Sequence, residues 1–193
     1  LAPNLTNYYR IRATNSGGFT AYTEISSATT PASGINVNFA DTAVTGVADY
    51  PIPGYLDDFG LVFGDRGNGY SYGWDDDNAQ HDRLRNSVNS PDRRYDTFNH
   101  LQKTDPLPAA RTWEVDLPNG LYLVHIVSGD ATATDSVFHW DVEGYVSQAL
   151  APAANDWWRE FHLTVRVNDG RLTLNNGPLA ANNKIAFVDI YPA

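Results

Sequence analysis

The stretch Glu160-Phe161-His162-Leu163-Thr164-Val165-Arg166-Val167 alternates strictly between polar and apolar side chains. Its apolar residues, at every second position from Phe161 to Val167, would share one face of an extended strand, and the polar residues would share the other. The Asn168-Asp169-Gly170 sequence that follows is typical of a tight turn. This pattern predicts a β-sheet that packs through one face.

Short segments of the same kind cover the chain from Ile35 onward, separated by Gly, Pro, Asn and Asp. Pro118-Asn119-Gly120 predicts a second hairpin turn, and no stretch has helical periodicity. We therefore expect an all-β protein, a β-sandwich or jelly roll. The strands are expected at residues 35–39, 61–63, 70–74, 94–102, 112–117, 121–128, 135–142, 158–167, 171–174 and 184–191.

The composition excludes several classes of function. The 193 residues include no cysteine, which excludes a disulfide scaffold, a thiolate metal site and a cysteine nucleophile. The formal net charge of −10 argues against a nucleic-acid partner, and no apolar run is long enough to span a membrane. The chain also has no methionine, so we expect it to be a piece of a longer protein.

Residues 1–33 differ from the rest. Tyr8–Thr14 and Phe19–Thr29 predict two strands around the turn at Asn15–Gly18, followed by a linker of small residues. This pattern resembles the last two strands of a fibronectin type III domain, with Tyr8 at the corner-tyrosine position. We expect a hairpin remnant that carries no function of its own and leans on the main domain at 34–193 or on a neighbouring chain.

A candidate site lies between Tyr50 and Lys103, where aromatic residues are mixed with Gly, Asp, Asn and Arg. Sugars offer apolar C–H faces and rings of hydroxyl groups, so a sugar site needs aromatic platforms beside planar polar groups. The predicted ligand-binding residues are Tyr70, Tyr72, Trp74, Asp75, Asp77, Arg83, Arg85, Asn89, Tyr95, His100, Trp157 and Trp158.

Structural roles remain open for many of these residues. Trp74 would equally suit the core, and Trp157 and Trp158 would point in opposite directions along a strand, one buried and one exposed. The Arg- and Asp-rich run at 82–96 could also serve only to fix its own loops.

Four sequence blocks carry a second resemblance: Gly64–Trp74, Ser90–Thr97, Pro118–Tyr122 and Asn182–Ile190. Their order resembles the malectin-like, galactose-binding-like sandwiches of secreted bacterial polysaccharide-degrading enzymes. The resemblance implies a secreted, non-catalytic carbohydrate-binding module. Its partners would be a polysaccharide or oligosaccharide and a catalytic domain in the same polypeptide.

No cofactor is expected to be required. Modules of this kind often hold a structural calcium ion between the first strand and a late carboxylate, which would correspond to Asn38 and Asp189. This sequence departs from that pattern, because its first strand contains Asn36 and Asn38 but no acidic residue. The remaining histidines, at 81, 125, 139 and 162, are expected to have structural roles.

Two alternatives remain. The first is a lyase or hydrolase on a jelly roll, using His100 and Gln102 with Arg83 or Arg85, or the pair Asp92 and Asp96. The second is an adhesion or spacer module without a small ligand. The chain has no Gly-x-Ser-x-Gly elbow, phosphate loop or dinucleotide fingerprint.

Overall fold

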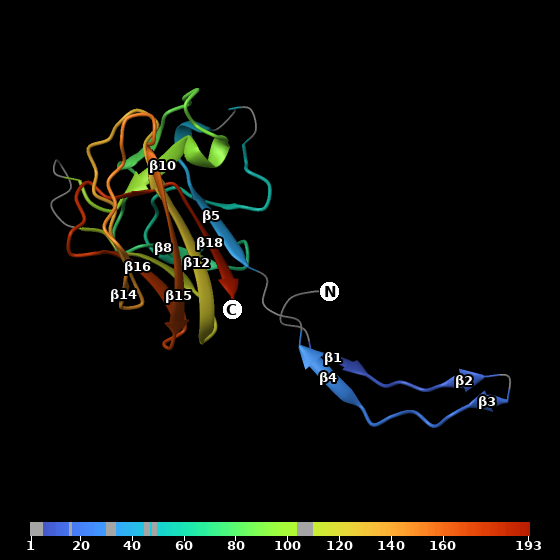
Figure 1. Ribbon diagram of the computed structural model, residues 1–193. Coiled ribbons are helices and arrows are strands. Elements are labelled where there is room, and N and C mark those ends of the chain that lie inside the picture. Colours follow the sequence, from blue (N-terminus) through green and yellow to red (C-terminus); the bar gives the residue numbers. More distant parts are fainter. Residues whose placement is uncertain (1–5, 16, 30–33, 45–46, 48–49, 104–109) are drawn as a thin grey trace.

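The computed structural model describes residues 6–15, 17–29, 34–44, 47, 50–103 and 110–193. Two large sheets face each other as a β-sandwich (Figure 1), which confirms the all-β prediction. Within the described residues the helical segments are two short 3-10 turns, η1 (Thr42–Val44) and η2 (Arg93–Tyr95).

The first sheet has six strands, in the order β14 (Tyr145–Val146), β13 (Trp140–Val142), β16 (Arg171–Asn176), β11 (Trp113–Asp116), β8 (Ser71–Trp74) and β7 (Gly64–Asp65). The second has five, in the order β15 (Trp158–Val167), β12 (Gly120–Gly129), β18 (Phe187–Pro192), β5 (Ile35–Phe39) and β6 (Leu56–Asp58). A smaller sheet consists of β17 (Lys184–Ile185), β10 (Thr97–His100) and β9 (Asp82–Leu84).

The alternation at 160–167 predicts the inner and outer faces of β15 correctly. Phe161, Val165 and Val167 are buried between the sheets, whereas Glu160 and His162 are exposed on the outer face. The space between the sheets is filled by aliphatic side chains and aromatic rings. The indoles of Trp74, Trp113 and Trp140 are fully buried there, so the tryptophans of these strands are core residues.

A buried carboxylate joins the two sheets. Asp58, at the end of β6, accepts hydrogen bonds from the indole N–H of Trp74 and from that of Trp113, and from the backbone N–H of Gly60. Burial raises the pKa of Asp58, and these hydrogen bonds act against that rise. The three donors satisfy a charge that would otherwise be costly inside the sandwich.

Both predicted turns are present, but neither closes a hairpin. The turn at 118–119 leads from β11 in the first sheet to β12 in the second, and the turn at 168–170 leads from β15 to β16 in the opposite direction. The Asn119 side chain joins the two turns, because it accepts a hydrogen bond from the N–H of Gly170 and donates one to the carbonyl of Asn168. This end of the sandwich is therefore tied together.

Some predicted strands are shorter than expected. Residues 61–63 contribute a single bridge from Val62 to Trp74, and most of 135–139 is irregular before β13 begins. The strands β6 to β10 all lie within the candidate region 50–103.

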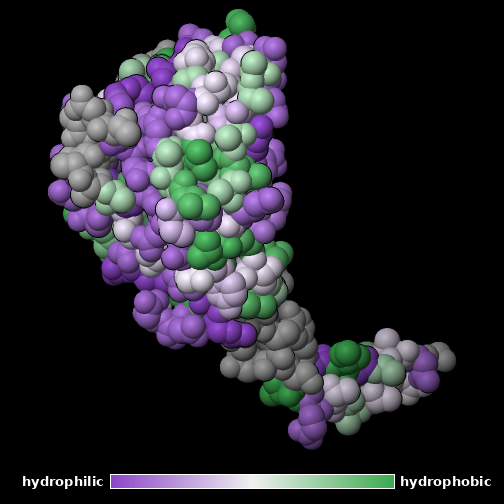
Figure 2. Space-filling model, turned by 60° about the vertical axis from the view of Figure 1, so that its left-hand side comes forward, coloured by the Kyte–Doolittle hydropathy of each residue, from purple (hydrophilic) through white to green (hydrophobic). Residues whose placement is uncertain are grey.

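The N-terminal segment forms a separate two-stranded ribbon (Figures 1 and 2). β1 (Thr6–Tyr9) pairs with β4 (Ser26–Thr29), and β2 (Thr14–Asn15) pairs with β3 (Gly18–Phe19). Every described side chain from 10 to 25 is exposed, so this part of the ribbon does not lean on the main domain, and contact with a neighbouring chain stays a prediction. The side chain of Tyr8 and the linker at 30–33 lie outside the described residues.

Candidate functional site

A groove opens beside η2. This 3-10 turn lies at the upper end of the sandwich in Figure 1, away from the C-terminus. Its volume of about 740 Å³ falls in the range of small-ligand sites. Two segments line it, one before β6 and one between β9 and β10. The lining residues are Ile52, Pro53, Asn86, Ser87, Val88, Ser90, Asp92, Arg93, Arg94 and Asp96.

Hydrogen bonds within the β9–β10 loop fix the shape of this groove. The carboxylate of Asp96 accepts the backbone N–H of Ser87 at 3.0 Å and the guanidinium of Arg93 at 2.8 Å. Arg93 also donates to the side-chain oxygen of Asn86 at 2.7 Å. Asn86 has a φ of 45°, a left-handed conformation that Asn adopts more readily than most residues. The polar groups of the groove are thus held in place before any ligand arrives.

Arg94 connects the groove to the outer face of the five-stranded sheet. Its guanidinium binds both carboxylate oxygens of Asp92, at 3.0 and 2.6 Å, and donates to the hydroxyl of Tyr55 at 3.1 Å. The Tyr55 hydroxyl in turn donates to Asp189 at 2.6 Å. Burial and the Asp189 carboxylate raise the pKa of Tyr55, so the phenol keeps its proton and its role as a donor.

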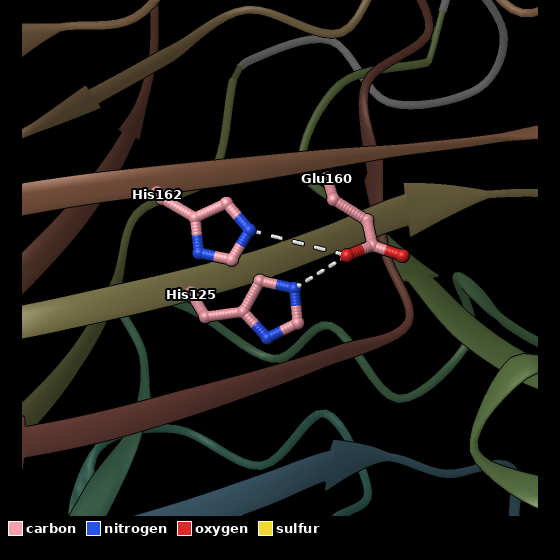
Figure 3. Close-up of side chains that lie close together, drawn as sticks. All are labelled: His125, Glu160 and His162. Carbon is pink, nitrogen blue, oxygen red and sulfur yellow. Dashed lines mark hydrogen bonds and ion pairs between the residues drawn. The ribbon is translucent and has the colours of Figure 1, made fainter.

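The chain of polar contacts continues from Asp189 on β18 to His125 on β12 and Glu160 on β15. The other oxygen of Asp189 lies 2.9 Å from Nδ1 of His125, whose Nε2 is 3.1 Å from the Glu160 carboxylate. Figure 3 shows the rings of His125 and His162 side by side, near that carboxylate. A hollow of about 320 Å³ lies over this part of the sheet. Its lining residues are Leu123, Val124, His125, His162, Leu163, Thr164, Asp189 and Tyr191.

Two of the predicted aromatic platforms are buried, so their assignment to a sugar surface is wrong. Tyr72 is 2% exposed and donates its hydroxyl to the carbonyl of Asp57, and Trp74 is fully buried against Asp58. Tyr70 is half-buried and packs against the main core. The alternation of these three residues predicts a shared face correctly, but that face points inward.

Tyr95 and Trp158 belong to a small second core on the outer face of the five-stranded sheet. Their rings pack edge to face, with 5.3 Å between the ring centroids. The Tyr95 ring also packs edge to face on Phe187, with 5.1 Å between the centroids. The Trp158 indole lies directly against Gly129, where a Cβ would overlap the ring. Trp157 and Trp158 are both half-buried, so the expected division into one buried and one exposed ring is wrong.

Several predicted polar ligands have structural partners. Arg85 forms a double hydrogen bond with Asp130, at 2.8 and 2.6 Å, Arg83 donates to the carbonyls of Gln80 and Asp82, and the Asn89 amide donates to the carbonyl of Ala131. These bonds match the structural interpretation of the run at 82–96. Asn89 and Arg85 lie close to the groove in sequence but are not among its lining residues.

His100, Asp75 and Asp77 also lie away from the groove lining. His100 is 4% exposed, which argues against direct contact with a ligand, and its Nδ1 lies 2.8 Å from the carbonyl of His81. Burial lowers the pKa of His100 to about 4, with a smaller opposing effect of that carbonyl. Asp75 and Asp77 are exposed, and each caps a backbone N–H.

The two residues of the expected calcium site are engaged separately. Both oxygens of Asp189 already accept or share hydrogen bonds, with Tyr55 and His125, and the Asn38 amide donates to Thr97. The buried oxygen of Asn38 has no hydrogen-bond partner among the described residues and is a suitable calcium donor. The strand register does not pair Asp189 with Asn38, because Asn38 lies opposite Phe187 and Asp189 lies opposite Asn36. Calcium stays a prediction.

The residues proposed for the catalytic alternatives are also engaged. Asp92 is paired with Arg94 and Asp96 with Arg93, while His100 is buried. The convergence of His125, Glu160 and His162 is not predicted from the sequence. The sequence carries part of the signal, because Glu160 and His162 share the polar face of the alternating strand.

The sequence matches no protein-family model and no curated protein. Solved structures show similarity in fold. Protein YXIM from Bacillus subtilis is 19% identical with a TM-score of 0.53, over 83% of this chain and 40% of that one. A calcium-binding mutant of Bacteroides uniformis β-glucuronidase 2 is 9% identical with a TM-score of 0.55, over 96% of this chain and 22% of that one.

A family 35 carbohydrate-binding module from Clostridium thermocellum is also among the structural neighbours, with 12% identity and a TM-score of 0.31, over 50% of this chain and 88% of that one. The chain thus spans less than half the length of YXIM and about a fifth of the glucuronidase. In the described part of the chain, no helix has the length and apolar character needed to cross a membrane.

Proposed function

We propose that this chain is a non-catalytic carbohydrate-binding module that uses the groove beside η2. The observation that carries the proposal is the groove itself, about 740 Å³, with amide, hydroxyl, carboxylate and guanidinium groups in its lining. These are the groups that exchange hydrogen bonds with sugar hydroxyls. Because their mutual hydrogen bonds hold them in place, a ligand would spend little free energy on ordering them.

The charges of the groove favour a ligand with little net charge. Two arginines, Arg93 and Arg94, are balanced by two aspartates, Asp92 and Asp96, and each arginine is paired with one of them. Apolar contact would come from Ile52, Pro53 and the fully exposed Val88. This combination suits a neutral oligosaccharide with its alternating apolar faces and hydroxyl edges.

The proposal also covers the family of the sandwich and the longer protein to which it would belong. We place the sandwich in the malectin-like group, after a fibronectin type III-like ribbon, in a secreted bacterial protein that also carries a polysaccharide-degrading domain. The structural similarity to part of a β-glucuronidase, of which this chain spans 22%, supports an origin among carbohydrate-active proteins. Binding would need no cofactor and would involve neither nucleic acid nor a membrane.

Affinity electrophoresis on soluble polysaccharides, with a glycan array, tests the proposal. We expect retention on at least one neutral glycan, unchanged by EDTA. Asn86→Gly keeps the left-handed turn and removes the amide, and Val88→Ala removes exposed apolar contact. Each should weaken binding by about fivefold or more, roughly 1 kcal/mol.

Leu179→Ala is the matched control, because Leu179 is 66% exposed and is not part of the groove. It should leave retention unchanged. Absence of retention on every glycan would refute the proposal. Unsaturated products from uronic-acid polymers, seen by ultraviolet absorbance, would instead favour a lyase.

A further inference from the structure

A group of nitrogen and oxygen donors lies on the exposed part of the five-stranded sheet, outside the groove. His125 on β12 is the direct cross-strand partner of His162 on β15, and Glu160 precedes His162 by two residues on the same face. The potential ligand atoms of these three residues all lie within 4.8 Å of one another. The β-sheet register therefore brings His125 next to two residues that lie 35 or more positions later in the sequence.

The two imidazole rings are stacked in parallel. Their centroids are 4.4 Å apart and their planes differ by 4° (Figure 3). Nε2 of His125 lies 3.1 Å from a Glu160 oxygen, and Nε2 of His162 lies 4.0 Å from the same oxygen. Ligands at about 2.1 Å from a tetrahedral metal ion are about 3.4 Å apart, which is close to the present separations. Because an imidazole binds a metal in its own ring plane, one of the two stacked rings must also rotate out of the stack for both to bind one ion.

Two of the three side chains are exposed enough to make the movement that metal binding requires. The side chains of His162 and Glu160 are 74% and 51% exposed, so both can rotate without disturbing the core. His125 is the anchored member of the group, with a side chain 23% exposed.

A second observation points to a ligand role for His125. Its Nδ1 is 2.9 Å from Asp189, a carboxylate that is itself held by the Tyr55 hydroxyl. With Nδ1 bonded to the Asp189 carboxylate, Nε2 is the nitrogen left for a metal ion, which would take the place of the proton that Nε2 shares with Glu160. Metal-binding histidines commonly have such a carboxylate behind them, because it fixes the ring and the tautomer.

We propose that His125, His162 and Glu160 form a binding site for a divalent transition-metal ion, with Zn²⁺ as the best fit, and that Asp189 orients His125. Two imidazoles and one carboxylate suit zinc better than calcium, which prefers oxygen donors only. Three protein ligands on an exposed sheet leave further coordination positions open toward solvent. An exogenous carboxylate, hydroxyl or imidazole could occupy them.

Isothermal titration of the metal-free full chain with Zn²⁺ tests the proposal, with Co²⁺ absorption in the visible range as a second readout. We expect one site per chain. His162→Gln and Glu160→Gln should each weaken binding at least tenfold. Because both side chains are exposed, circular dichroism should confirm that these variants remain folded. Asp189→Asn should weaken binding by about 10- to 100-fold if it orients the ligand.

His81→Gln is the control, since it removes an imidazole that lies outside the group. It should leave the affinity unchanged. In nuclear magnetic resonance spectra, the imidazole signals of His125 and His162 should move on Zn²⁺ addition while that of His81 stays. Failure of the wild-type chain to bind Zn²⁺ would overturn the proposal, as would equal affinities in the wild type and His162→Gln.

Discussion

Asp58 and Trp74 are hydrogen-bonded across the two sheets, with 2.7 Å between Oδ1 and the indole nitrogen. The other oxygen of Asp58 lies 2.9 Å from the indole nitrogen of Trp113. Each buried indole N–H thus has its own acceptor on one carboxylate, so the two largest side chains in this part of the core can pack without an unsatisfied donor.

Replacing Asp58 by Asn should destabilise the sandwich strongly. One acceptor oxygen would become an NH₂ group that faces an indole N–H, so two donors would meet without an acceptor. We expect the free energy of unfolding to fall by about 2–4 kcal/mol, measured by urea denaturation. Asp57→Asn is the matched control, because half-buried Asp57 makes no such contact to the tryptophans, and its effect should be small. Equal losses in both variants would contradict the assigned role.

The ion pair of Asp130 should control stability in acid. Burial raises the pKa of Asp130, but the hydrogen bonds from Arg85 and the charge of Lys184 outweigh that effect and lower it to about 2. Because the folded pKa lies below the ordinary value of 3.8, the stabilisation is complete above pH 3.8 and is lost as the pH falls toward 2.

Asp130→Asn should therefore cost about 2 kcal/mol at neutral pH and reduce the loss of stability below pH 4. Urea denaturation of both proteins at a series of pH values from 6 to about 3 provides the measurement. A variant whose stability declines in parallel with the wild type below pH 4 would show that another group is responsible.

Buried His100 should act in a different pH range. Its folded pKa of about 4 lies below the ordinary value of 6.5, so the unfolded chain takes up the proton first. Stability is then unaffected above pH 6.5 and falls by up to about 3 kcal/mol as the pH decreases toward 4. His100→Gln carries no titrating group and should remove most of this decrease. The comparison requires denaturation curves at pH 7 and pH 4.5, and an unchanged difference between them would rule out His100.

Gly129→Ala should displace Trp158. A Cβ at position 129 would overlap the indole ring, which must then move away from Tyr95. We expect a shift in tryptophan fluorescence and a loss of about 1–3 kcal/mol. In the control variant Gly64→Ala, the nearest atom to the new Cβ is 4.0 Å away, so neither quantity should change much. An unaltered spectrum for Gly129→Ala would mean that the small second core is looser than the structure indicates.

Local patterns in the sequence predict local features well. The alternation at 160–167 predicts both the strand and its buried face, and the Pro-Asn-Gly and Asn-Asp-Gly sequences predict turns at the correct positions. Turn chemistry does not specify which sheet the next strand joins, so the crossing of both turns between the sheets could not be predicted. The alternation around Tyr72 and Trp74 does not specify the buried face, because aromatic side chains suit a core as well as a sugar-binding surface and the residues between them, Ser71 and Gly73, are small and uncharged.

The candidate site depends even more than the strand order does on how segments that are distant in sequence pair with one another. The groove combines Ile52 and Pro53 with a loop more than 30 residues later, and the His125–His162 pair depends on how β12 and β15 align. No spacing in the sequence contains that information. The prediction that residues 50–103 would supply a site was general enough to include the groove, while most of the individual residues chosen there have structural partners.

The groove loop at 85–96 joins two strands that pair directly, with Leu84 opposite Thr97. Asp58 receives its hydrogen bonds from Gly60, Trp74 and Trp113, all outside this loop, so we expect substitutions at exposed loop positions such as Val88 to leave those contacts and the sheet register in place. Natural variants of such a domain could therefore acquire new ligands through this loop alone while the sandwich evolved slowly. In the laboratory, a randomised library confined to residues 86–92 would be the economical starting point for a binder of altered specificity.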